Sequence, residues 1–166
     1  YILSGQKAWI SNGGVAERYV GCATVEPGSG SRGTTAFLVR GDDPGLRCGP
    51  PIRKMGQRAI PNCELFLDDL FVAAERRLGE EGQGFVGLMR TFDRSRVTLA
   101  ASATGLARAA LEYAVDYAKE REQFGKPIAQ HQAVAFRLAD MALRVDAARL
   151  LTWRAAEMLD RGERVT

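Results

Sequence analysis

The sequence has few of the residues that build metal sites and disulfide frameworks. Its 166 residues contain three cysteines and one histidine. Cys22, Cys48 and Cys63 lie far apart in the chain, and no CxxC pair occurs. A structural zinc site needs four closely grouped ligands, and a disulfide framework uses an even number of cysteines. We therefore expect neither, and a reducing compartment fits this cysteine usage best.

Long apolar runs and a strong charge of one sign are also missing. No stretch is apolar for the length that a membrane-spanning helix requires, and no signal-peptide pattern occurs. The formal net charge is only +3, and the basic residues are spread along the chain. A nucleic-acid-binding protein concentrates its positive charge on one face or segment. We therefore expect no membrane partner and no nucleic-acid partner.

The first half of the chain has the pattern of an antiparallel β domain, which we place at 1–78. Short runs rich in β-branched and aromatic residues, such as AWIS, RYVGCATV, TAFLV and CELFLDDLFV, alternate with segments rich in Gly, Pro, Asn and Asp. This spacing is typical of antiparallel strands. The dipeptide Asn12-Gly13 predicts a tight hairpin, because both residues tolerate positive φ.

The second half, 79–166, changes to a helical period after a glycine-rich segment, Gly79–Phe85, which we interpret as a hinge. Apolar residues recur every three or four positions in two long stretches, which predicts two helices. The first stripe contains Leu99, Ala103, Leu106, Ala110, Tyr113 and Tyr117; the second contains Val134, Leu138, Met141, Val145, Ala148, Ala155 and Leu159. Between them Gly125 and Pro127 break the helix. The fold class is therefore α+β: a β-barrel-like domain followed by an antiparallel helical hairpin, part of a bundle.

Neither helix has enough partners in this sequence to bury its whole apolar surface. The chain also begins with a strand-like run of residues at Tyr1 and ends in RGERVT, directly after a helical segment. We therefore expect a piece of a longer polypeptide, with the rest of the bundle supplied by that polypeptide or by another copy.

Four stretches, in this order and across the change from β to α, make the sequence similar to the acyl-CoA dehydrogenase family. They are WISNGG, MGQRAI (Met55–Ile60), TFDRSRVTLAAS (Thr91–Ser102) and REQFGKPIAQHQ (Arg121–Gln132). The resemblance covers essentially the whole chain, as the later part of the middle β domain and the first half of the C-terminal helical domain. It implies an FAD enzyme that introduces an α,β double bond into acyl-CoA thioesters, in bacterial cytoplasm or, in a eukaryote, the mitochondrial matrix.

By this resemblance, Trp9, Ile10 and Ser11 belong to a segment beside the flavin ring. The indole of Trp9 offers an aromatic surface, and Ser11 offers a hydroxyl and a backbone N–H to the ring edge near N5. The Ile10 side chain would point away, because neighbours on a strand face opposite sides. Without the other motifs, Trp9 would be interpreted as a core residue and Asn12 as a turn former.

The family likewise implies that the turn at 121–132 reaches a flavin dinucleotide that a neighbouring subunit binds. Arg121 suits the pyrophosphate, because its planar guanidinium presents paired donors. Phe124 would pack at the adenine end, and Gln123, His131 and Gln132 are candidate polar contacts. The cofactor site would then require a homo-oligomer, a dimer or a tetramer. The alternative interpretation is an ordinary helix-end arginine and a surface histidine.

Asp93 and Arg96 are placed by the resemblance at the acyl-CoA substrate. The family uses a glutamate base that lies either far downstream or immediately before the arginine matching Arg96, where this chain has Ser95. No catalytic base is therefore expected in this chain, and the segment alone should be inactive. Its other candidate carboxylates occur in hinge or helix-surface contexts and should be solvated; they are Glu80, Glu81, Glu112, Glu120 and Glu122.

Three functions stay open at this point. The first is an acyl-CoA dehydrogenase that passes electrons to an electron-transfer flavoprotein. The second is a relative with altered chemistry, of the acyl-CoA oxidase or nitroalkane oxidase type. The third is a non-catalytic helical assembly module.

Overall fold

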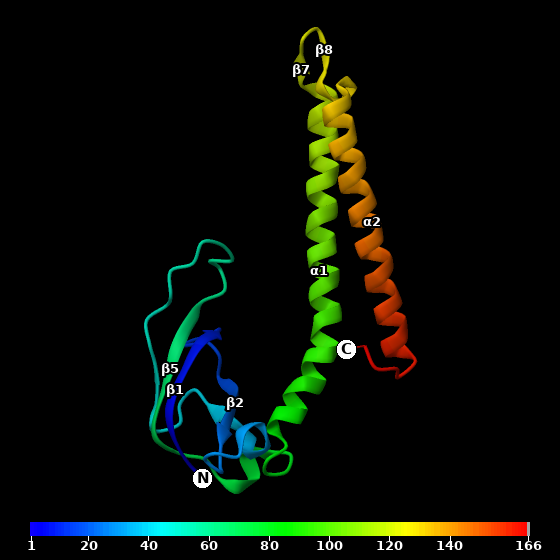
Figure 1. The fold of residues 1–166 in the computed structure, drawn as a ribbon. Helices are drawn as coiled ribbons and strands as arrows, with labels where there is room; N and C mark the ends of the chain where they lie inside the picture. Colours follow the sequence, from blue (N-terminus) through cyan, green and yellow to red (C-terminus); the bar gives the residue numbers. More distant parts are fainter. Residues whose placement is uncertain (166) are drawn as a thin grey trace. The chain divides into compact units, whose positions relative to one another are not determined.

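The computed structural model describes residues 1–165. The chain forms two compact units, Tyr1–Leu88 and Met89–Thr166. The first unit contains the β-strands of the two larger sheets, and the second contains the helical hairpin (Figure 1). The division into domains at 1–78 and 79–166 stays a prediction.

The β unit contains two three-stranded antiparallel sheets. The first has the order β1 (Ile2–Ser11), β5 (Asn62–Phe71) and β4 (Leu46–Cys48). The second has the order β2 (Arg18–Thr24), β3 (Thr34–Arg40) and β6 (Arg77–Leu78). Two short 3-10 helices lie in the connections, η1 (Gly30–Gly33) and η2 (Ala74–Arg76). The predicted antiparallel β fold is confirmed, with β4 and β6 as short strands that the sequence pattern did not indicate.

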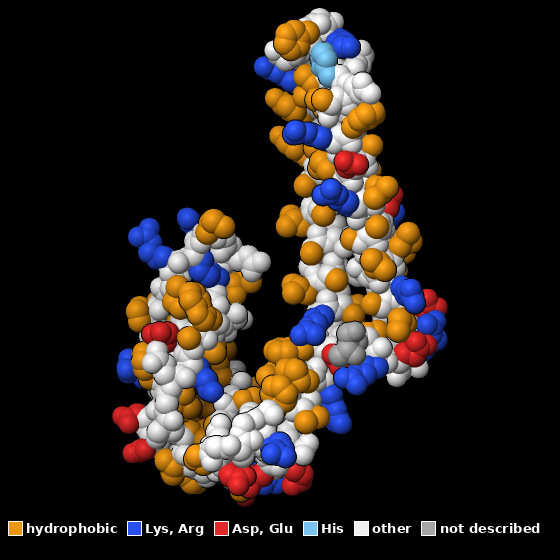
Figure 2. All heavy atoms as spheres, in the orientation of Figure 1, with side chains coloured by type: hydrophobic (Ala, Val, Ile, Leu, Met, Phe, Trp, Pro, Cys, Tyr) orange, Lys and Arg blue, Asp and Glu red, His pale blue; other side chains and the backbone are white. Residues whose placement is uncertain are grey.

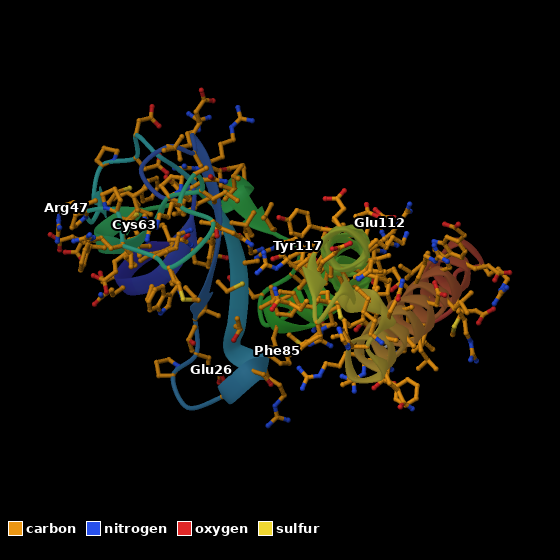
Figure 3. All side chains as sticks on the ribbon, turned by 90° about the horizontal axis from the view of Figure 1, so that it is seen from above. Glu26, Arg47, Cys63, Phe85, Glu112 and Tyr117 are labelled. Carbon is orange, nitrogen blue, oxygen red and sulfur yellow. The ribbon has the colours of Figure 1, made fainter. Side chains whose placement is uncertain are left out.

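Both sheets contribute side chains to one core. Along β3 every second residue is buried, with Thr35, Phe37 and Val39 facing inwards, as the two-residue period of a strand requires. From the first sheet, Cys63 and Leu70 are almost completely buried in the same core. In Figure 3, Cys63 lies inward on β5, whereas Arg47 lies at the rim.

A cavity of about 540 Å³ remains between the two sheets. Its lining is mostly apolar and comes from both sheets, including Leu3, Ile10 and Val39. Protein interiors are close-packed and contain few voids larger than a water molecule. The described residues therefore leave a mostly apolar pocket between the two sheets unfilled.

The hairpin prediction at Asn12-Gly13 is wrong. The chain does turn there, and Asn12 has a φ of 58°, but β1 pairs with β5 and β2 pairs with β3. The turn therefore connects two different sheets. Gly13 serves a close approach instead: a Cβ at this position would lie 2.2 Å from the Sγ atom of Cys63. Long-range pairing with β5 decided the partner of β1, and the local turn signal did not.

The segment Gly79–Phe85, interpreted above as a hinge, is packed against β3. The backbone N–H of Gly82 donates to the hydroxyl of the buried Thr35 at 3.0 Å. A Cβ on Gly84 would lie 2.8 Å from the backbone nitrogen of Ala36. This close approach explains a glycine at the first residue of the helix that follows.

The helical unit is built by two long helices, α1 (Gly84–Glu120) and α2 (Gln132–Asp160). They run side by side as an antiparallel pair (Figure 1). The connection contains a small hairpin, β7 (Glu122–Gln123) with β8 (Lys126–Pro127), and the 3-10 helix η3 (Ile128–Gln130). The predicted helical hairpin, and its break at Gly125 and Pro127, are confirmed.

The apolar stripe predicted for α1 does not pack against α2. Leu99, Leu106 and Tyr113 are 70%, 74% and 75% exposed. The less exposed residues of α1 follow another row, 97, 104, 111, 114, 115 and 118, in which Ala118 is 3% exposed. The spacing of apolar residues correctly predicted an apolar face on α1. However, α1 has two such faces, and the described residues cover only the other one.

The stripe predicted for α2 is largely correct. Val134, Leu138 and Ala155 are half-buried, and Val145 is buried. A second row on α2, formed by Phe136, Leu143 and Leu150, stays 60% or more exposed. Figure 2 shows hydrophobic side chains along these helices. Among the described residues, no helix combines the length and apolar character that crossing a membrane requires.

Candidate functional site

The segment around Trp9 lies at the irregular end of β1. The pairing with β5 shifts register between Lys7 and Ile10, and Trp9 has a φ of 60°. Positive φ is costly for an aromatic residue and persists only where the surroundings impose it. The indole of Trp9 is 68% exposed, and Ser11 is exposed as well. Ile10 instead packs against the core, on the opposite face from Trp9.

The start of β5 and the loop before it hold this segment in place. The Nδ2 atom of Asn62 lies 3.1 Å from the Oγ atom of Ser11 and 3.3 Å from the carbonyl oxygen of Trp9. Lys54 donates to the Oδ1 atom of Asn62 at 2.5 Å and to the carbonyl oxygen of Ile60 at 2.5 Å. The loop Met55–Ile60, one of the four family-like stretches, therefore closes beside Trp9 and Ser11.

Sequence reasoning missed Lys54 and Asn62. MGQRAI indicated the neighbourhood, since it directly follows Lys54 and ends two residues before Asn62. The contact joins positions 51 residues apart in the chain. Only the pairing of β1 with β5 brings them together, and neither residue type is distinctive by itself.

The connection between the helices forms a tight exposed turn. Phe124 and Gly125 have φ values of 55° and 75°, and positive φ at both central residues is the geometry of a type I′ hairpin turn. Such turns favour Asn or Gly at the first position, so a phenylalanine there is unusual. Its side chain is 93% exposed. The turn therefore presents an aromatic ring to its surroundings at a conformational cost.

Five cofactor-binding residues were predicted in the connection between the helices. The turn brings four of them close together: Arg121, Gln123, Phe124 and His131. The His131 Nε2 atom lies 3.1 Å from the carbonyl oxygen of Gln123, and the His131 ring meets the Phe124 ring edge-on at 5.9 Å. The carbonyl oxygen of Arg121 accepts from the N–H of Ile128 at 2.7 Å. Arg121 is exposed, and so is Gln132, the fifth residue, which begins α2.

The predicted substrate residues lie in the first turns of α1. Asp93 lines a groove of about 970 Å³ with Arg94 and Ser95, opposite the last residues of α2 and those that follow it. The hydroxyl of Ser95 donates to the carbonyl oxygen of Phe92 at 3.4 Å. Arg96 is exposed and does not line this groove. The structure therefore groups Asp93 with Ser95 but not with Arg96.

The five glutamates expected to be solvated are all exposed. Glu80 and Glu81 lie within ion-pair distance of Arg77, and Glu112 pairs with Arg108 one helical turn away. Figure 3 shows Glu112 on α1, the helix that also carries Tyr117. Within residues 1–165, no group of three or more His, Cys, Asp or Glu side chains is arranged to hold a metal ion.

Both parts of the chain match family models of known proteins. Residues 1–70 match the model of the acyl-CoA dehydrogenase middle domain, and residues 82–166 match that of the acyl-CoA dehydrogenase C-terminal domain. The chain belongs to the acyl-CoA dehydrogenase family.

Individual relatives of this acyl-CoA dehydrogenase family member are similar over nearly all of the chain. A cyclohex-1-ene-1-carbonyl-CoA dehydrogenase of Geobacter metallireducens is 48% identical over 99% of this chain and 43% of its own length. The solved butyryl-CoA dehydrogenase of Megasphaera elsdenii has 42% identity and a TM-score of 0.94, over 99% of this chain and 43% of that one. The structure of PigA with FAD and proline has 35% identity and a TM-score of 0.96, again over 99% and 43%.

The chain spans about two fifths of the length of the relatives that it matches. The match to consecutive middle and C-terminal domain models confirms the family assignment, and the similarity to the solved butyryl-CoA dehydrogenase confirms the α+β fold.

The two exposed groups of residues fit an FAD molecule chemically. At the β1 end, an exposed indole stands beside a hydroxyl whose oxygen already accepts from Asn62. At the helix connection, an exposed phenylalanine follows an exposed arginine at an interval of three residues. Flavin rings and adenine need flat apolar contacts and edge donors, and pyrophosphate needs a forked cation.

Proposed function

We propose that this chain is the middle-to-C-terminal segment of an FAD-dependent acyl-CoA dehydrogenase. The observation that carries the proposal is the match to both domain models, in order, by a chain whose two exposed residue groups suit the two ends of FAD. Bound FAD would supply the hydride acceptor for oxidation of the acyl chain. The residues of this chain would bind and orient FAD and the acyl-CoA substrate.

At the β1 end, Trp9 would cover one part of the flavin ring, and Ser11 would donate to its polar edge. A donor at that edge stabilises the negative charge that develops as the ring is reduced. Ile10 contributes its backbone to this segment while its side chain anchors β1 in the core.

At the helix connection, Arg121 would bind the pyrophosphate, and Phe124 would pack on the adenine end, with Gln123, His131 and Gln132 as polar neighbours. We propose that these groups serve the FAD of a second subunit, so the enzyme is a homodimer or a tetramer of paired dimers. The exposed guanidinium of Arg121 supports this, because none of the ion pairs among the described residues uses its charge.

At the start of α1, Asp93 and Arg96 would face acyl-CoA. Ser95 has no basicity suited to removing an α-proton, so the carboxylate base would come from a part of the enzyme outside this chain. That carboxylate requires a raised pKa and an apolar pocket. None of the five exposed glutamates has such a pocket.

The test uses the complete enzyme. The purified protein should carry a flavin with absorption near ~450 nm, a general property of the cofactor that carries this chemistry. Anaerobic addition of an acyl-CoA should bleach that absorption, and an electron-transfer flavoprotein should reoxidise the enzyme. Gel filtration should give a dimer or a tetramer. A protein purified without flavin, and unable to take it up, would refute the proposal.

The two alternatives give different results in the same experiment. Rapid reoxidation by oxygen instead of the flavoprotein would indicate an oxidase-type relative. A flavin-free assembly would indicate a non-catalytic module.

A further inference from the structure

We infer that Asn62, held by Lys54, is a positioning residue that makes the hydroxyl of Ser11 a hydrogen-bond donor toward the flavin edge. The inference rests on the proposed function, because it concerns the same FAD site. It adds two residues that neither the sequence motifs nor the family comparison single out.

The orientation of the Asn62 amide is fixed by two groups with only one possible role each. The ammonium of Lys54 can only donate, so the atom it meets at 2.5 Å is the amide oxygen. The carbonyl of Trp9 can only accept, so the atom it meets at 3.3 Å is the amide nitrogen. The amide N–H groups therefore face Trp9 and Ser11.

This orientation decides what the hydroxyl of Ser11 can do. The amide nitrogen lies 3.1 Å from the Ser11 oxygen and can only donate, so this oxygen accepts. The single hydroxyl proton must then point elsewhere, and within residues 1–165 no acceptor for it is found. Ser11 is exposed, so the proton is directed to whatever binds there.

Lys54 strengthens this arrangement. A charged donor on the amide oxygen polarises the amide and makes its N–H groups better donors, because linked hydrogen bonds reinforce one another. The order of donation is Lys54 to Asn62, Asn62 to Ser11, and Ser11 to the ligand. A positive charge at the far end suits a ligand edge on which negative charge develops.

The same amide holds the strained backbone beside it. Its second contact is the carbonyl of Trp9, whose φ of 60° is unfavourable for an aromatic residue. Asn62 is half-buried and paired within the sheet to Ser11. One side chain thus fixes both the hydroxyl and the backbone of the segment that bears the exposed indole.

The deciding variant is Asn62→Asp in the complete enzyme. The introduced carboxylate keeps the shape and keeps Lys54 as a partner, but it can only accept. The hydroxyl of Ser11 would then donate to that carboxylate and turn away from the flavin. We expect a lower flavin reduction potential than in wild type, a shifted flavin spectrum, and FAD affinity reduced about tenfold, the scale of one lost hydrogen bond.

The added charge needs its own control. Asn12→Asp places a carboxylate next to Ser11 in the chain, at a residue whose φ of 58° an aspartate tolerates. It does not reverse any hydrogen bond of Ser11. We expect a smaller change in potential than with Asn62→Asp.

A double-mutant cycle separates positioning from structure. In the Ser11→Ala background no hydroxyl remains to be turned, so Asn62→Asp should change the potential by less than about half as much as in wild type. Equal changes in both backgrounds, or a loss of thermal stability with no change in potential, would overturn the inference while leaving the proposed function intact. A flavin-free wild-type protein would refute both, and that result is recognised before any variant is made.

Discussion

At the scale of single residues, the β unit contains one nearly buried ion pair. The Oδ2 atom of Asp43 accepts from the guanidinium of Arg76 at 2.5 Å and from the backbone N–H of Arg40 at 2.9 Å. The side chains of Asp43 and Arg76 are 11% and 20% exposed. Burial by itself raises the pKa of Asp43, but these two donors outweigh it and hold the pKa below its usual range.

Asp43 should therefore make stability depend on pH. Because its folded pKa is lowered, its contribution is complete above the unfolded pKa of ~3.9 and is lost as pH falls through the folded value. Asp43→Asn should lower the free energy of unfolding by about 1.5–3 kcal/mol at pH 7, the range of a hydrogen bond to a charged group. Urea unfolding at pH 7 and near pH 2 measures this. A difference between variant and wild type that stays constant with pH would contradict the assignment.

At the scale of elements, the turn at Phe124 and Gly125 combines strain with exposure. Asparagine adopts positive φ more easily than phenylalanine. Phe124→Asn should therefore leave thermal stability unchanged or slightly raised, since a 93% exposed ring contributes little packing. In the complete enzyme it should weaken FAD binding, because the aromatic contact is lost.

The matched control for this turn is Gly125→Ala. It keeps the ring but puts a Cβ on a residue with a φ of 75°, so it should lower stability by about 1 kcal/mol. Melting curves and FAD titrations of both variants are the measurement. A Phe124→Asn enzyme that is less stable but binds FAD normally would show that the ring serves only the turn.

The elements also show what sequence could and could not predict. The spacing of apolar residues along the sequence identified both helices and most strands, because an element that is buried on one face repeats its apolar residues at its own period. The same spacing did not give the correct contacts where two different packing arrangements are compatible with one local pattern. Asn12-Gly13 turns the chain in either topology, and α1 has two apolar faces, so only long-range packing selects between them. The family-like motifs predicted Trp9, Ser11 and the 121–132 turn as candidate site residues, whereas the contact of Asn62 with Ser11 depends on the register between β1 and β5.

At the scale of the whole molecule, both units leave apolar surface or space that the described residues do not cover. The β unit has its cavity of about 540 Å³, and both helices have rows of exposed apolar side chains. Exposed apolar area of this kind marks an interaction surface. We expect further protein, from the complete enzyme or another subunit, to cover it.

A pair of variants on α1 tests this expectation. Leu106 is 74% exposed, whereas Leu111 is half-buried in the covered row. In the 166-residue chain alone, Leu106→Gln should change stability by less than about 0.5 kcal/mol and reduce self-association. Leu111→Gln should destabilise by about 1–3 kcal/mol, because it puts a polar group into a packed interface.

The complete enzyme gives the decisive comparison. There both variants should be destabilising, because the row with Leu106 is covered as well. Thermal unfolding and sedimentation of the two forms measure the effect. If Leu106→Gln stays neutral in the complete enzyme, that row faces solvent and needs another explanation.

The approach of Gly13 to Cys63 restricts the order in which the sequence can change. A methyl group on residue 13 would lie 2.2 Å from the Cys63 sulfur and 3.0 Å from the Ile10 carbonyl oxygen. Cys63→Ala would remove the closer of these two contacts, so alanine at position 13 should cost less stability once position 63 has become smaller. The reverse order passes through an intermediate with a steric clash. In lineages that share this fold, the change at position 63 should therefore precede the change at position 13. Stability measurements on the two single variants and the double variant would show which single variant is destabilised.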